Sequence, residues 1–279
     1  RADITTESFK SNDPTTWGYA EPPRRVLGIK THDGRLYYAV AEGPEIWSVA
    51  IGDGGRFDEP RREIALPTDA EPYEVADIAF TAAGWMILAQ RPPVTGGYDY
   101  VTPVASGPAR VLRYRPADDG RGWVEAPDEY AVGLRDDNRN AAGGLALGYG
   151  YKSGGGLDYG RCEATLWATG ESLLQQASRA IKVEKVPGFA TSAIDGLQGT
   201  DIGLVRPENV PPERARFVDY DGRFVDNGYR GYLGDAEIPY HCAGDAGERW
   251  EPEFEVPYWS TGYDDEPAPE LDLAVRKTA

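Results

Sequence analysis

The sequence predicts an all-β protein, a β-propeller of four-stranded antiparallel blades or an incomplete fragment of one. Two observations support this prediction. Glycine and proline contribute 34 and 22 of the 279 residues, a frequency at which long helices rarely survive but short strands joined by turns do. Short apolar runs recur along the chain with a period of roughly 45 to 65 residues, which is typical of propeller blades too small to bury their own faces.

The first repeat contains four short runs joined by tight turns. The runs occupy residues 26–30, 36–40, 45–51 and 62–66. H-D-G-R at 32–35, E-G-P at 42–44 and G-D-G-G at 52–55 separate them, and each of these carries glycine at a position suited to a turn. We therefore expect one antiparallel meander here.

The second repeat is found by aligning Gly84 with Gly34. A-D-I-A-F then falls beside V-L-G-I-K, and W-M-I-L-A falls beside R-L-Y-Y-A. The expected strands are 76–80, 85–89, 110–114 and 123–126, with a Pro/Gly-rich insertion at 92–108.

Two looser repeats follow. The third is expected to start at 143–147 and to continue through a glycine turn at 154–156 into 164–168. The fourth is expected to start at T-D-I-G-L, residues 200–204, and to include 216–224; a last strand is expected at 233–238. The one helical candidate is G-E-S-L-L-Q-Q-A-S-R-A-I-K, residues 170–182. The alternative fold is a β-sandwich whose segments resemble one another by accident.

Composition divides the chain into four parts. An N-terminal extension covers 1–23, the propeller 24–243, an acidic Pro-rich linker 244–270, and the start of a further module 271–279. A start at Arg1 and an abrupt, strand-like end suggest that both ends are cut from a longer polypeptide.

The net charge and the lengths of the apolar runs exclude two classes of partner. With 46 acidic and 29 basic residues, the net charge is −17, whereas phosphate binding needs clustered Lys and Arg. We expect no nucleic-acid partner. No run approaches 18 apolar residues, so we also expect no membrane insertion.

Parts of the sequence resemble known bacterial families. G-R-L-Y-Y-A-V with E-I-W-S-V, and A-D-I-A-F with W-M-I-L-A, resemble bacterial propeller repeats of the broad lactonase-like and virginiamycin B lyase-like kind, over about residues 24–240. L-D-L-A-V-R-K-T-A at 271–279 resembles the first strand of a repeat domain common in large bacterial surface proteins. This second resemblance implies that the parent protein continues as immunoglobulin-like modules on the cell surface.

The cysteines and histidines do not form a zinc motif. Cys162 and Cys242, with His32 and His241, lack the paired spacings that zinc sites use. An even cysteine count in a chain of exported type favours a Cys162–Cys242 disulfide, and two buried free thiols are the alternative. No G-x-S-x-G or phosphate-loop motif is present.

Aspartates at three strand openings form the candidate metal site. Asp77, Asp201 and Asp235 are expected on innermost strands, with Glu237 on the same face as Asp235. Clustered carboxylates favour a hard cation, so Ca²⁺ is the expected cofactor. Leu27 and Gly144 occupy the matching places in the first and third repeats, which leaves the ring incomplete. The alternative is that each aspartate simply accepts hydrogen bonds from neighbouring backbone amides.

Two functions are compatible with these features. The first is a binding or structural module of a secreted, periplasmic or surface-displayed bacterial protein, with a protein or cell-surface polymer as its partner. The second is a lactonase- or lyase-like enzyme in which a divalent cation polarises a carbonyl oxygen, with Glu237, Glu74 or His241 as acid or base. The scarcity of histidine favours the first, and no catalytic residue is assigned.

Overall fold

The chain is all-β throughout the part that the structure describes. The computed structural model describes residues 10, 25–40, 44–67, 73–92, 107–120, 122–134, 136–175, 193–212, 214–219 and 234–238. These residues form three four-stranded antiparallel sheets and one two-stranded hairpin, with a single 3-10 turn at Asp53–Gly55 and no α-helix. The predicted fold class is therefore confirmed as all-β with four-stranded antiparallel sheets. Apart from Lys10, the predicted extension at 1–23 lies outside the described residues, as do the linker at 244–270 and the tail at 271–279.

The first sheet is a simple meander. Its strands follow chain order: β1 (Val26–His32), β2 (Arg35–Val40), β3 (Glu45–Ala50) and β4 (Arg61–Ala65). Asp33 and Gly34 join β1 to β2 with φ angles of 44° and 71°, and two left-handed residues give the twist that a two-residue hairpin needs. This turn sets the register of the sheet, since it places His32 opposite Arg35.

The second sheet repeats this order with longer links. It consists of β5 (Val75–Phe80), β6 (Met86–Gln90), β7 (Val111–Tyr114) and β8 (Asp128–Tyr130). The expected strand at 123–126 is wrong, because Trp123 pairs with Pro116 in a small hairpin between β7 and β8. The chain pairs with β7 again only at Asp128–Tyr130, where Tyr130 lies opposite Val111.

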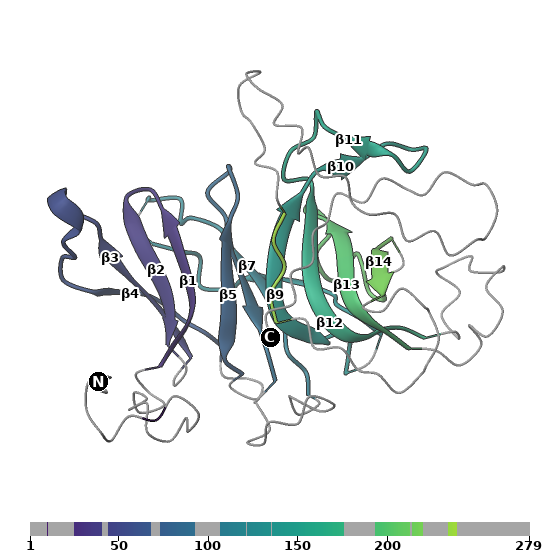
Figure 1. Ribbon diagram of the computed structural model, residues 1–279, viewed down its shortest axis with the longest axis horizontal. Coiled ribbons are helices and arrows are strands. Elements are labelled where there is room, and N and C mark those ends of the chain that lie inside the picture. The colour runs from purple at the N-terminus through teal and green to yellow at the C-terminus, as the bar shows by residue number, and fades with distance from the viewer. Residues whose placement is uncertain are drawn as a thin grey trace.

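The third sheet carries an insertion. Its strands run in the order β9 (Ala141–Gly148), β12 (Thr165–Gln175), β13 (Ala193–Asp201) and β14 (Arg216–Asp219). The hairpin of β10 (Gly150–Tyr151) and β11 (Leu157–Asp158) lies between β9 and β12 in sequence and projects beyond their ends (Figure 1).

Two expectations for this region are wrong. The helix expected at 170–182 is a strand as far as Gln175, and the rest of that range is not described. Gly170 pairs with both Gly196 and Ala141, so strands on either side hold the backbone extended there. The fourth repeat expected from residue 200 belongs to the third sheet instead, since Thr200 and Asp201 end β13 and residues 216–219 form β14.

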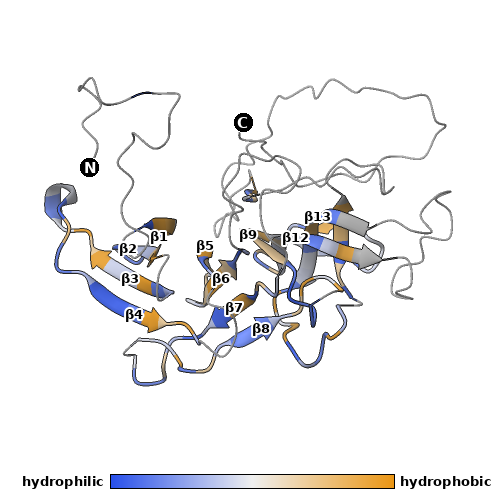
Figure 2. Ribbon diagram, turned by 90° about the horizontal axis from the view of Figure 1, so that it is seen from below, coloured by the Kyte–Doolittle hydropathy of each residue, from blue (hydrophilic) through white to orange (hydrophobic). Residues whose placement is uncertain are grey.

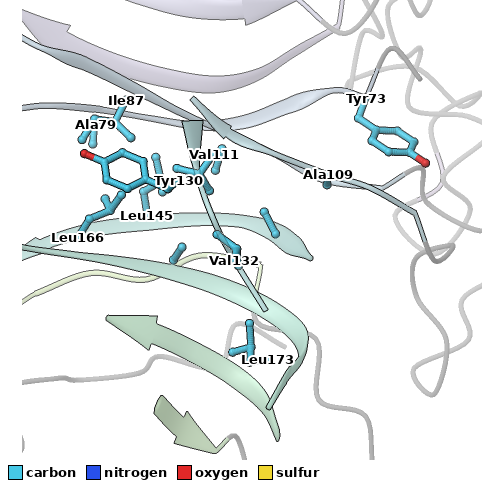
Figure 3. Packing of buried hydrophobic residues seen from close by; sticks show 13 residues of the cluster. Tyr73, Ala79, Ile87, Ala109, Val111, Tyr130, Val132, Leu145, Leu166 and Leu173 are labelled. Carbon is cyan, nitrogen blue, oxygen red and sulfur yellow. The ribbon is translucent and has the colours of Figure 1, made fainter. Parts of the chain in front are cut away.

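The sheets stack face to face in a fan (Figure 2). All five residues of β6 are buried, and their side chains alternate between two cores. Met86 and Leu88 face the first sheet, where they pack with Tyr37, Ala39, Ile46 and Ile64. Ile87 and Ala89 face the third sheet, where they pack with Leu145, Leu166, Ala168 and Leu173 (Figure 3). A sheet covered on both faces explains why four consecutive residues of β6, from Met86 to Ala89, are apolar.

A further core covers the other face of the third sheet. Ala146, Trp167 and Leu197 from β9, β12 and β13 pack there with Ala236, while Ile238 lies against the same cluster. Residues 234–238 therefore extend the stack beyond the third sheet, although only a single bridge at Glu237 is formed there.

Candidate functional site

The candidate site lies where the first strands of the sheets meet. β1, β5 and β9 run side by side (Figure 1). A Cβ atom on Gly28 of β1 would lie 3.2 Å from the Cα atom of Asp77 in β5, closer than nearly all real Cβ contacts. Glycine at position 28 thus permits the two backbones to approach beside Asp77.

Both carboxyl oxygens of Asp77 accept backbone hydrogen bonds. Oδ1 accepts from the N–H of Ile78 at 2.7 Å, and Oδ2 accepts from the N–H of Leu145 in β9 at 2.8 Å. The side chain therefore connects β5 to β9 and has little freedom to rotate. This agrees with the alternative reading of strand-opening aspartates, in which each accepts hydrogen bonds from backbone amides.

Asp235 reaches the same place from residues 234–238. A Cβ atom on Gly144 would lie 2.6 Å from the Cα atom of Asp235, so the segment passes directly over the glycine that precedes Leu145. The Oδ1 atom of Asp235 accepts the N–H of Ala236 at 2.8 Å, and Ala236 itself is buried. Asp77 and Asp235 are thus brought together across β9, near enough for the charge of Asp235 to act on Asp77; we call them the Asp77–Asp235 pair.

This contact changes the protonation of Asp77. Burial, followed by the negative charge of Asp235, raises the pKa of Asp77 to about 7, and the two backbone N–H donors only partly oppose this effect. An ordinary aspartate is fully ionised at neutral pH, whereas this one holds a proton about half of the time. The pair can therefore take up or release a proton near neutrality.

The other two predicted site residues do not join this pair: Asp201 lies on another strand, and Glu237 is exposed to solvent. Asp201 lies at the end of β13, two strands from β9, and forms an exposed ion pair with Arg161 at 3.2 Å. The expectation that it opens an innermost strand is wrong, because its D-I pattern ends an outer strand. Glu237 is two residues from Asp235 and is exposed.

The metal prediction rests on few ligands. Within the described ranges, no group of three or more His, Cys, Asp or Glu residues is arranged to hold a metal ion. Ca²⁺ takes six to eight oxygen ligands, and the Asp77–Asp235 pair supplies two carboxyl groups whose oxygens already accept backbone hydrogen bonds. We therefore assign no metal to these residues, and calcium stays a prediction from the sequence.

The other acid–base candidates have structural partners. Glu74 forms an ion pair with Arg91 at 3.1 Å. The ring of His32 stacks on Phe80 with centroids 4.1 Å apart, and its Nε2 atom lies 3.4 Å from Asp33. His241 lies outside the described residues.

Sequence reasoning missed the role of Gly144. In the sequence, Gly144 only marked a place where a ring of carboxylates was incomplete. In the structure, its lack of a side chain allows the backbone of Asp235 to pass close to β9. The available signal was the Gly143–Gly144 pair inside an apolar strand, since glycine within a strand often marks a close backbone approach.

The disulfide remains a prediction. Cys162 lies in the link between β11 and β12, and Cys242 lies outside the described residues. A Cys162–Cys242 bridge should make the intact mass of the unreduced protein two hydrogens lower than that of the reduced protein. Neither cysteine should then react with an alkylating reagent before reduction. Two thiols that alkylate readily in the native, unreduced protein would contradict the bridge.

Comparison with known proteins assigns no family. No protein-family model matches the chain, and no curated protein matches its sequence. Among the described residues, no helix has the length and apolar character needed to cross a membrane.

Proposed function

We propose that the chain forms a β-propeller, or part of one, and serves as a binding or structural module of a secreted or surface-displayed bacterial protein. The observation that carries this proposal is the arrangement of the sheets. Three four-stranded meanders stack face to face with their first strands side by side, and each uses its neighbour to bury a face. Propeller blades stack in the same way around a central axis.

The site chemistry favours binding over catalysis. The two carboxyl groups that meet at the first strands have backbone donors, and the other acid–base candidates described above pair with neighbours. A net charge of −17 keeps an exported domain soluble and limits non-specific association. The partner would be a protein chain or a cell-surface polymer, bound through loops that vary without disturbing the sheets.

The proposal is tested by binding and turnover measured on the same purified protein. We expect no hydrolysis or elimination with lactones, esters or polyuronates, with or without divalent ions. We expect saturable co-sedimentation with isolated bacterial cell walls, with an unrelated acidic protein as the control. Metal-dependent turnover that is lost in Asp201→Ala or Asp235→Ala would contradict the proposal and favour the lactonase- or lyase-like alternative.

A further inference from the structure

We propose that the protonated form of Asp77, which lies beside Asp235, holds residues 234–238 against β9, and that this segment is released when Asp77 ionises. The inference concerns how the segment is retained and does not depend on what the protein binds. It rests on the position of two carboxyl groups on either side of one strand.

The geometry prevents the two carboxyl groups from avoiding each other. Asp77 is fixed through both oxygens by the N–H groups of Ile78 and Leu145. Asp235 is fixed through its backbone, which passes over Gly144, and through the hydrogen bond from Ala236. When Asp77 is ionised, the two negative charges repel; when Asp77 is protonated, this repulsion is removed and its O–H can donate to Asp235.

The apolar contacts of the segment are small enough for this change to matter. Ala236 is buried against Ala146, Trp167 and Leu197, and Ile238 lies partly buried beside them. An alanine buries little apolar area, so the segment depends on the state of the carboxyl groups more than a core strand would. Asp235 is exposed, which lets the proton exchange with solvent.

Among the described residues, no cationic side chain forms an ion pair with Asp77 or Asp235. β9 and β6 contain no ionisable residue, and β5 contains only Asp77. The segment adds the acidic Glu237. β1 carries His32, which stacks on Phe80, and the exposed Lys30, which forms no ion pair with either carboxyl group among the described contacts. Glu74, next to β5, is already paired with Arg91 beyond the end of β6.

The direction of the pH effect follows from linkage. The pKa of Asp77 is about 7 when the segment is docked, against 3.8 for an ordinary aspartate, so the docked state binds the proton more tightly. Release of the segment removes the charge of Asp235 and part of the burial, so docking is most favourable at acidic pH, weakens as the pH rises, and levels off above about pH 7. Within this window the opening equilibrium increases by up to about tenfold per pH unit.

The test is hydrogen exchange of the Leu145 and Ala236 amides, corrected for intrinsic exchange rates, between about pH 5 and pH 8 in the presence of a chelator. In the wild type, protection of both amides should fall with pH by up to about tenfold per unit and then level off. Asp235→Asn keeps an acceptor for Ala236, gains an N–H donor for Asp77 and removes the opposing charge, so its protection should vary clearly less with pH than that of the wild type. Glu237→Gln makes the same charge change two residues away and should behave as the wild type.

Two outcomes of the exchange experiment would overturn the proposal, and a third outcome, with added calcium, would replace it. One is a pH dependence that persists unchanged in Asp235→Asn, and the other is protection that is flat with pH in the wild type. Carboxyl carbon shifts provide a second readout that does not require the variants to be equally stable. Asp77 should titrate near neutrality in the wild type and at a lower pH in Asp235→Asn, because the substitution removes the charge of Asp235 and leaves the burial. Calcium chloride that restores full protection at about pH 8 only when both aspartates are present would show that a cation, rather than a proton, holds the segment.

Discussion

Gln198→Ala is expected to lower the free energy of unfolding by about 3–5 kcal/mol. Gln198 is 1 % exposed on β13, and its amide joins the third sheet to the chain that follows β8. Its Nε2 atom donates to the carbonyl of Ala131 at 2.8 Å, and its Oε1 atom accepts the N–H of Gly133 at 2.8 Å. The substitution leaves both buried backbone groups without their partner, and each such loss costs about 1–3 kcal/mol.

Urea unfolding of two further variants separates the causes. Gln198→Leu retains most of the side-chain volume but none of the hydrogen bonds, which include one from Nε2 to Thr200 Oγ1 at 3.0 Å, so it should lose nearly as much stability as Gln198→Ala. Glu208→Ala changes an exposed residue of the following loop and should stay within about 0.5 kcal/mol of the wild type. Wild-type stability in Gln198→Leu would show that the hydrogen bonds contribute little.

Gly144→Ala is expected to cost about 1–3 kcal/mol and to displace residues 234–238. The added methyl group would lie 2.6 Å from the Cα atom of Asp235 and 2.9 Å from its carbonyl carbon. Both are backbone atoms, so no side-chain rotation relieves the contact. The segment must move away, and with it the carboxyl group that raises the pKa of Asp77.

Thermal unfolding together with the carboxyl titration of Asp77 tests this prediction. In Gly144→Ala the melting temperature should fall, and the pKa of Asp77 should move from about 7 towards the ordinary value of 3.8. Gly154→Ala is the matched control, because a methyl group there meets nothing within 4 Å. A Gly144→Ala protein that keeps the raised pKa of Asp77 would contradict the proposed close approach.

The first sheet was the easiest part of the fold to predict. Its links are short, and each strand starts within one residue of the expected position. A two-residue turn such as Asp33–Gly34 sets the register by itself, so local sequence decides the whole meander. In the second sheet the small Pro116–Trp123 hairpin separates β7 from β8, and local pattern then assigned the fourth strand too early.

The third sheet shows why local pattern fails for longer links. The run at 170–175 reads as helical because of its leucines and glutamine, yet β13 pairs with it at Gly170, Leu174 and Gln175, and β9 pairs with it at Gly170. Tertiary pairing of this kind overrides intrinsic propensity and cannot be read from neighbouring residues.

Only part of the candidate site could be predicted, again because strand pairing depends on residues distant in sequence. The strand-opening aspartates were recognised by a short D-I or G-D pattern, which selected Asp77 and Asp235 correctly as neighbours. The same pattern selected Asp201, which ends β13. Which strand of a sheet is innermost depends on the order of pairing, and that order is decided by contacts distant in sequence.

The links between first and second strands differ greatly in length at one end of the stack. Two residues join β1 to β2, five join β5 to β6, and sixteen, including the β10–β11 hairpin, join β9 to β12. All three sheets nevertheless keep four strands, and Glu163 from the longest link accepts the N–H of Ala82 from its neighbour at 2.6 Å. Closing a longer loop costs little additional entropy. Evolution can therefore lengthen these links while the stack of sheets remains the same. For the same reason, a peptide can be grafted into the exposed Gly154–Gly156 turn.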